Sequence, residues 1–164
     1  MTTPTPLPKS TRFFRPGVTK MFYAPDVAEQ DAPTRSEVDA STDLSGEVST
    51  IDGFGVTSGQ IETPDLVSLF TGKIGGRTSV DDSSITFYAS KDSQDVRTIL
   101  PRGTEGYILI MGGGDVDGGT MDVFQVRVIS APKQYTLEDE AAKIVVQFSI
   151  VREPSEDVTI PAAA

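Results

Sequence analysis

The sequence contains no histidine, no cysteine and no tryptophan among its 164 residues. Without histidine it lacks the commonest general base and neutral metal ligand of proteins, and the hydrolytic triads built on histidine are excluded. Without cysteine, disulfide frameworks, thiolate metal sites and cysteine nucleophiles are excluded as well. An enzyme of this composition would depend on paired carboxylates or on a lysine in a pocket. We therefore expect a non-enzymatic protein that uses no cofactor.

Close pairs of acidic residues are scarce outside the charged runs of the chain. Asp81 and Asp82 are adjacent, and adjacent residues on an extended strand point to opposite faces of the sheet. The two carboxyl groups would then share no proton, as a catalytic pair must. A solvated entry into a strand is the favoured interpretation.

Residues 112–119 form a glycine-rich segment that carries Asp115 and Asp117. Such a segment is typical of calcium loops, because Ca²⁺ takes several oxygen ligands from a backbone that can wrap around it. An EF-hand counted from Asp115 would place Val126 where a bidentate glutamate belongs, and the segment occurs only once. A flexible hairpin loop between two strands is therefore favoured over a calcium site.

Long apolar stretches are also missing. The N-terminal residues have no apolar core of the kind that a signal peptide needs, and no stretch approaches the length of a transmembrane helix. We therefore expect synthesis and folding in a cytoplasm, with no insertion into a membrane.

Basic residues are outnumbered, since 14 Lys and Arg stand against 24 Asp and Glu and give a formal charge of -10. The average surface therefore repels the phosphates of nucleic acids and anionic membranes. Tight binding of a DNA backbone requires clustered Lys and Arg, so it is not expected here.

The length fits one domain, which we place at residues 20–153 between two arms. Residues 1–19 are rich in Thr and Pro and carry a basic, aromatic patch at Arg12, Phe13, Phe14 and Arg15. This composition predicts an extended arm rather than a packed element. Residues 154–164 resemble a second arm. We expect contacts outside the domain to hold both arms, with the basic, aromatic patch as the contact of the first.

Between the arms the dominant signal is alternation of apolar and polar residues, which predicts half-buried strands and a mainly β fold. Residues 84–90 and 143–150 alternate in this way, and residues 107–111 form an apolar run suited to a central strand. In residues 121–130 the apolar phase changes, which predicts a bulge near Val123. Weaker strands are expected at residues 21–24, 35–39 and 43–51.

One short helix is expected at about residues 93–100. Asp92 or Ser93 can cap it, and Pro101 ends it. Val96 and Ile99 share one face with Leu100. A helix of about two turns is marginal alone in water, so it must dock on the strands.

A long connection runs from about residue 53 to residue 81, and compact domains rarely keep one of this length without a use. Its apolar residues include Leu66, Leu69, Phe70 and Ile74, without strand or helix order. These side chains could fold back as a lid on their own core, or they could dock on a neighbouring subunit. The connection lacks the residue order of a phosphate-binding loop. Its basic residues Lys73 and Arg77 are better explained by an acidic surface on another copy.

Several segments follow one another in an order that is typical of one family. They are Thr19-Lys20-Met21-Phe22-Tyr23-Ala24-Pro25, Ile61-Glu62-Thr63-Pro64-Asp65-Leu66, Phe70-Thr71-Gly72-Lys73-Ile74, Gly76-Arg77-Thr78, Asp82-Ser83-Ser84-Ile85-Thr86-Phe87-Tyr88-Ala89-Ser90, Asp95-Val96-Arg97, Leu100-Pro101-Arg102-Gly103-Thr104, Met121-Asp122-Val123-Phe124 and Val126-Arg127-Val128. Through them, residues of about 20–152 resemble the major tail protein, or tail tube protein, of long-tailed bacteriophages, particularly those of actinobacterial hosts.

The resemblance implies an antiparallel β-sandwich with one flanking helix and a long inter-strand loop. It further implies homo-hexameric rings whose inner strands join into a barrel, and stacking of these rings into a tube through which the genome passes. The long loop would reach the adjacent ring, through Asp65, Leu66, Leu69, Phe70, Lys73, Ile74 and Arg77, and the arms would add contacts between rings. The implied partners are further copies of the chain, a tape measure protein, a tail terminator and distal tail proteins. The implied location is the virion tail, assembled in the host cytoplasm.

An acidic channel wall would keep a passing genome from adhering, because it repels phosphates over a Debye length of roughly 10 Å. Glu37, Asp39 and Glu47 are the candidates for lumen-facing residues, since they alternate with Val38 and Val48 on the early strands. The same residues could equally face the outer solvent.

Two other classes of function remain open. One is a calcium-dependent ligand- or carbohydrate-binding β-sandwich that uses residues 112–119. The other is a different tail or head accessory protein, such as a tail terminator or a head-decoration protein.

Overall fold

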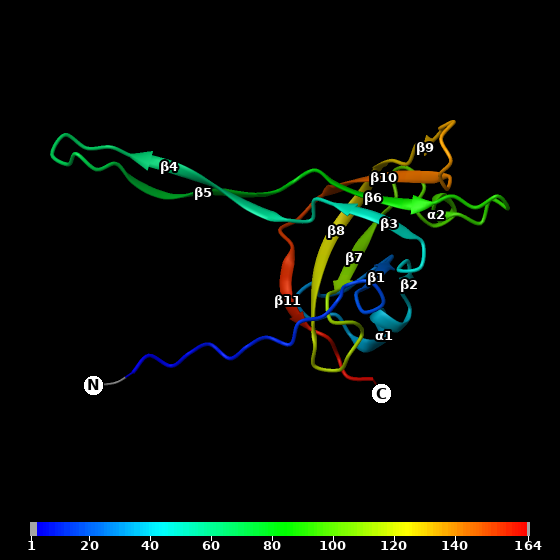
Figure 1. Ribbon diagram of the computed structural model, residues 1–164, viewed down its shortest axis with the longest axis horizontal. Helices are drawn as coiled ribbons and strands as arrows, with labels where there is room; N and C mark the ends of the chain where they lie inside the picture. The colour runs from blue at the N-terminus through cyan, green and yellow to red at the C-terminus, as the bar shows by residue number, and fades with distance from the viewer. Residues whose placement is uncertain (1–2, 164) are drawn as a thin grey trace.

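The computed structural model describes residues 3–163, so Met1, Thr2 and Ala164 of the two expected arms lie outside the described residues. The elements in chain order are β1 (Lys20–Ala24), α1 (Arg35–Asp39), β2 (Thr42–Asp43), β3 (Val48–Asp52), β4 (Val56–Thr63), β5 (Gly72–Val80), β6 (Ser83–Tyr88), α2 (Val96–Ile99), β7 (Glu105–Met111), β8 (Thr120–Ser130), β9 (Lys133–Gln134), β10 (Lys143–Ile150) and β11 (Ser155–Thr159). Figure 1 shows a body from which one long hairpin projects.

The strands form one nine-stranded sheet in the order β2-β1-β7-β8-β10-β6-β3, with β11 paired to β8 and β9 paired to β10, and a separate pair of β4 and β5. Every pairing is antiparallel. The prediction of a mainly antiparallel β fold is therefore confirmed. Among the described residues the sheet does not close into a barrel.

Strand β8 joins two halves of the sheet and is buried on both faces. Phe124, Val126 and Val128 lie in a first cluster with the inward side chains of β6 and β10. Met121 and Val123 lie in a second cluster with Leu109 and Met111, which also includes side chains of α1 and of the C-terminal segment. Two cores, one on each face, explain the change of apolar phase.

The predicted bulge near Val123 is absent from the pairing of β8 with β7, which runs without a shift from Asp122 to Arg127. Strand β8 meets a register shift with each of its other two partners. One lies beside Val123, where Val123 and Met121 pair with Ser155 and Val158 of β11. The other leaves Ile129 of β8 between Val128 and Ser130, which pair with Phe148 and Gln147 of β10.

Residues 35–39 form helix α1, so the predicted strand there is wrong. Thr34 is the N-cap, and its hydroxyl accepts from the backbone N–H of Glu37, whose carboxylate in turn accepts from the backbone N–H of Thr34. This reciprocal pair satisfies two donors that a short helix would otherwise leave free. Val38 is the buried residue of the helix. The helix expected at residues 93–100 is present as the shorter α2, and Asp95 caps it instead of Asp92 or Ser93.

The C-terminal segment is not a free arm along its whole length. Residues 155–159 form β11 on the edge of β8, and Val158 and Ile160 are buried in the second cluster. The Gln30 side-chain amide donates to the carbonyl of Glu153 at 2.8 Å. Two apolar residues alternating with acidic ones are a weak signal, so the sequence pattern does not predict this strand.

Candidate assembly surface

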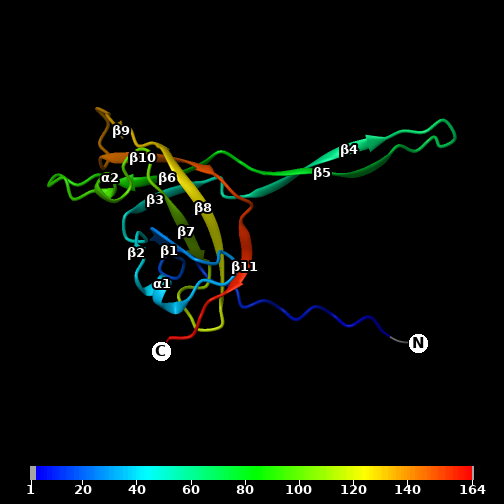
Figure 2. The same ribbon diagram turned by 180° about the vertical axis from the view of Figure 1, so that it is seen from behind.

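The segment predicted as a long loop is instead a β-hairpin that stands away from the body. Strands β4 and β5 pair with each other from Val56–Val80 to Thr63–Gly72, and neither pairs with the main sheet. Figures 1 and 2 show it projecting from the body on the same side as the N-terminal segment. Both faces of such a hairpin meet solvent.

The tip of the hairpin, residues 64–71, exposes a group of large apolar side chains. Relative exposure is 106% for Leu66, 96% for Val67, 108% for Leu69 and 81% for Phe70. Contiguous exposed apolar side chains of this kind mark interaction sites in soluble proteins. The tip is therefore no lid on its own core, and its docking on a neighbouring subunit stays a prediction.

The tip has a defined turn because its polar side chains bind its backbone. The Asp65 carboxylate accepts from the backbone N–H groups of Ser68 at 2.7 Å and Val67 at 2.8 Å. These two bonds, that of Ser68 first, lower the pKa of Asp65 below its usual value, although the side chain lies in open solvent. The Ser68 hydroxyl donates to the carbonyl of Phe70 and accepts from its N–H. The apolar side chains are thus displayed by a preorganised turn.

The remaining predicted contact residues lie along strand β5. Ile74 pairs with Ile61 across the hairpin, and both are about half exposed. Lys73 lies 3.4 Å from the Glu62 carboxylate, an exposed pair of little energetic weight. Arg77 lies on the same strand, closer to the root of the hairpin, and is exposed. The structure therefore brings Asp65, Leu66, Leu69 and Phe70 together at the tip, with the other three predicted residues on the stem.

The root of the hairpin is held by residues that no sequence pattern predicts. Gly53 and Phe54 both have positive φ, 77° and 59°, which turns the chain out of β3. A Cβ at Gly53 would lie 2.4 Å from the Asp82 carbonyl oxygen, so only glycine fits. The Phe54 ring packs against Phe124 with centroids 5.1 Å apart. The buried Ser83 hydroxyl accepts from the Phe54 N–H and donates to the Asp81 carbonyl. No sequence pattern predicts a positive φ at a phenylalanine. The adjacent Gly53 is the residue that indicates a turn here.

The predicted arm contacts lie in an extended segment. Residues 3–14 have no helix or strand and are exposed, and the first turn begins at Arg15, whose carbonyl accepts from Val18 and Thr19. Phe13 is 51% and Phe14 is 77% exposed. The Arg15 guanidinium lies 6.0 Å from the centre of the Phe13 ring, within cation–π range.

The three predicted lumen residues do not share a strand. Glu37 and Asp39 belong to α1, and Glu47 precedes β3. The Glu37 carboxylate accepts from the Ala28 N–H at 2.8 Å and from Thr34, and these bonds lower its pKa, that from Ala28 most. Asp39 accepts from Arg35 within the helix. The strand alternation on which these residues were chosen is therefore wrong for Glu37 and Asp39.

The acidic groups of residues 112–119 already have partners. Arg35 donates two hydrogen bonds to the Asp115 carboxylate, at 2.7 and 2.8 Å, and lowers the pKa of Asp115. Asp117 accepts from the backbone N–H of Ala163. Among residues 3–163 no group of three or more potential metal ligands comes together. Both carboxylates on which the calcium interpretation rests are thus engaged within the chain. In the same residues, no helix combines the length and the apolar character that crossing a bilayer requires.

Comparison with known proteins places these features in one family. A family model for the phage tail tube protein matches residues 7–163. One similar solved chain, at TM-score 0.48 and 11% identity, comes from the virion of a native gene transfer agent particle and is matched over 71% of this chain and 88% of its own length. Another, at TM-score 0.49 and 15% identity, is the SPP1 tail tube determined by solid-state NMR and cryo EM, matched over 87% of this chain and 78% of its own. No curated protein matches the sequence.

The family model spans the described body, the projecting hairpin and most of both terminal segments. The resemblance inferred from the ordered sequence segments is thereby confirmed. Such a protein has a structural role in the tail of a virion. The chain belongs to the phage tail tube protein family.

Proposed function

We propose that six copies of this chain form a ring and that such rings stack, through the β4–β5 hairpin, into the tube that conducts the phage genome into the host. The number of copies and the stacking go beyond family membership. The observation that carries the proposal is the exposed apolar tip of a hairpin whose two strands pair only with each other among residues 3–163.

The tip needs a partner for energetic reasons. A lone two-stranded hairpin is marginally stable in water, and this one has no covered face. Burying a Leu or Phe side chain contributes roughly 1.5–3 kcal/mol. Docking Leu66, Leu69 and Phe70 on an adjacent copy would therefore stabilise both the hairpin and the contact between rings.

The charged residues of the hairpin would set how this contact depends on salt. Lys73 and Arg77 are exposed cations on a chain whose formal charge is -10. They would meet acidic groups of the adjacent copy and steer its approach. Asp65 would act indirectly, by shaping the turn that displays the apolar side chains.

The acidic balance of the chain suits a channel for DNA. A wall with a surplus of carboxylates repels phosphates, so the genome would pass without specific binding. Glu37, Asp39 and Glu47 stay predictions as lumen-facing residues. Glu47 is the best of the three, because the Glu37 and Asp39 carboxylates already accept hydrogen bonds from Ala28 and Arg35 of their own chain.

The tube would meet other tail components at its two ends and inside its channel. A tape measure protein, a tail terminator and distal tail proteins are the partners we propose, with assembly in the host cytoplasm. The arm of residues 1–19 would add contacts between copies through Arg12, Phe13, Phe14 and Arg15. No step of this function requires catalysis.

Electron microscopy of the purified chain tests the proposal, together with a variant that carries Leu66→Ser, Leu69→Ser and Phe70→Ser. The wild-type chain is expected to form long hollow filaments with sixfold end views. The tip variant is expected to keep its circular dichroism spectrum and melting temperature but to form no filaments.

A matched control carries Tyr135→Ser and Leu137→Ser, which remove side chains of comparable exposure, 90% and 104%, from the β9–β10 connection. This control is expected to assemble. A wild-type chain that stays monomeric, or that stops at single rings, would contradict the proposal and favour an accessory role in the tail or head. Filaments from the tip variant would contradict the role of the hairpin.

A further inference from the structure

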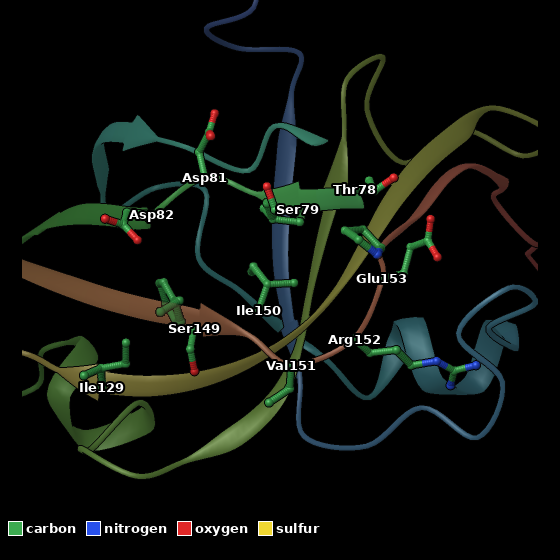
Figure 3. Close-up of a pocket in the computed structure, with 13 residues that line it drawn as sticks. Thr78, Ser79, Asp81, Asp82, Ile129, Ser149, Ile150, Val151, Arg152 and Glu153 are labelled. Atoms are coloured by element: carbon green, nitrogen blue, oxygen red, sulfur yellow. The ribbon is translucent and has the colours of Figure 1, made fainter. Parts of the chain in front are cut away.

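A cleft of about 450 Å³ opens where the root of the hairpin meets the end of β10. Its volume falls in the range of protein clefts that hold ligands, roughly 300–1,000 Å³. Its walls come from the end of β5, from the link to β6, from β8 and from the segment between β10 and β11. Figure 3 shows Asp81 and Asp82 on one side of it and Glu153 on the other, with Ile150 between them.

Two apolar side chains in the lining of the cleft are exposed, Ile129 at 49% and Val151 at 55%. Ile129 is the extra residue of β8 at the register shift with β10, between the paired residues Val128 and Ser130. Exposed apolar side chains of this kind offer a contact for an apolar group of another molecule.

The rim of the cleft is acidic. Asp81, Asp82 and Glu153 carry three negative charges against the one positive charge of Arg152. Within residues 3–163 none of these carboxylates forms an ion pair. A group that fills this cleft should therefore combine apolar side chains with positive charge.

One exposed segment of the chain has this chemistry. The N-terminal arm, residues 1–19, carries Lys9, Arg12 and Arg15 with Phe13 and Phe14 beside them, and it contains no acidic residue. Its two rings are exposed, and neither lines the cleft in its own chain. The tip of the hairpin is also exposed and apolar, but its one charged residue, Asp65, is negative. The exposed Tyr135 and Leu137 of the β9–β10 connection are followed by three acidic residues, at 138–140.

We propose that this cleft is the binding site for the N-terminal arm of another copy, with Phe13 or Phe14 against Ile129 and Val151, and Arg12 and Arg15 at the rim of Asp81, Asp82 and Glu153. The proposal rests on the proposed self-assembly and names the site that receives the arm. An aromatic anchor flanked by arginine is the residue combination that contributes most at protein interfaces.

Because the sequence contains no cysteine, a single introduced cysteine is the only thiol of its chain, so each cross-link has one possible site per chain. Two full-length single variants, Thr11→Cys beside the patch and Ser149→Cys in the cleft, are mixed under assembling conditions and treated with a short bismaleimide. A docked arm raises the effective concentration of the two thiols from the bulk value to about the millimolar range, so the covalent dimer should form about a hundredfold faster than an undocked pair. The undocked reference is Thr11→Cys mixed with Leu137→Cys, whose residue 137 is fully exposed on the β9–β10 connection.

Two further variants tie the cross-link to the proposed contacts. Phe13→Ser with Phe14→Ser should lower its rate more than about tenfold. Asp81→Lys with Asp82→Lys should lower it too, and adding Arg12→Glu with Arg15→Glu to the arm should restore it. Each variant is first checked for an unchanged melting temperature.

Several results would overturn the proposal. One is equal cross-linking of Thr11→Cys to residues 149 and 137; another is efficient cross-linking inside one chain that carries both Thr11→Cys and Ser149→Cys. Preferred cross-linking of Ser149→Cys to Val67→Cys would assign the cleft to the hairpin tip instead. Electron micrographs of the same samples distinguish the docking of the arm from the assembly of the tube. Filaments that form without the arm cross-link would contradict the docking of the arm alone. The cross-link without filaments would contradict the tube alone.

Discussion

At the scale of single residues, Glu37 shows how one side chain decides the structure of a segment. Glu37 and Asp39 alternate with the apolar Val38 as residues of a strand would, and this pattern predicts a strand. The capping box between Thr34 and Glu37 instead starts a helix of five residues. The pattern of Thr followed three residues later by Glu was present in the sequence, and it was the stronger signal.

Replacing Glu37 with Ala should lower the free energy of unfolding by about 1–2 kcal/mol, because two backbone N–H groups lose their acceptor. The pKa of Glu37 is lowered in the folded chain. Its contribution is therefore complete above the ordinary glutamate pKa of about 4.3 and is lost as the pH falls through the lowered value. Urea unfolding at neutral and acid pH, in the non-assembling tip variant, measures both effects.

Asp39→Ala is the control for Glu37, since it removes an exposed pair with Arg35 on the same helix. Such a pair contributes about 0.5 kcal/mol or less. Equal losses from the two variants, or a loss from Glu37→Ala that does not depend on pH, would show that the cap does not stabilise α1.

At the scale of elements, the hairpin explains why part of the structure was beyond the sequence pattern. Thr57, Ser58, Thr78 and Ser79 suit strands, yet all are exposed and no apolar face repeats along β4 or β5. Alternation of apolar and polar residues indicates a strand with one face buried against its own chain. A hairpin that no other described element covers carries no such signal, so the pattern predicts a loop there instead of two strands.

The turn at the tip of the hairpin should respond to acid through Asp65. Because two backbone N–H groups bind its carboxylate and lower its pKa, the turn is fully formed above the ordinary aspartate pKa of about 3.9 and loosens as the pH falls through the lowered value. NMR titration of the Val67 and Ser68 amide protons in the tip variant should give a midpoint below that value. Asp65→Asn should keep the turn without the pH response, and Asp65→Ala should lose both. A midpoint at or above the ordinary value would mean that the carboxylate does not hold the turn.

At the scale of the whole molecule, the mainly β fold was predictable from strands such as Ser83–Tyr88 and Lys143–Ile150. In these strands every second side chain lies in the core, so apolar and polar residues alternate in the sequence. The strand at Ser155–Thr159 was not predictable, because two buried residues, Val158 and Ile160, are too few to set a period against Glu156 and Asp157. Three features of the single chain would be covered by other copies in the proposed assembly. These are the exposed tip, the exposed arm and the open cleft.

Hydrogen exchange tests most directly whether another copy covers the hairpin tip. Amide exchange of residues 65–71, read by mass spectrometry, is compared between assembled wild-type filaments and the same chain after dissociation. Covered backbone should exchange at least about tenfold more slowly in the filament, while residues 135–141 of the β9–β10 connection serve as the internal reference. Filaments in which the tip exchanges as fast as in the free chain would contradict the account.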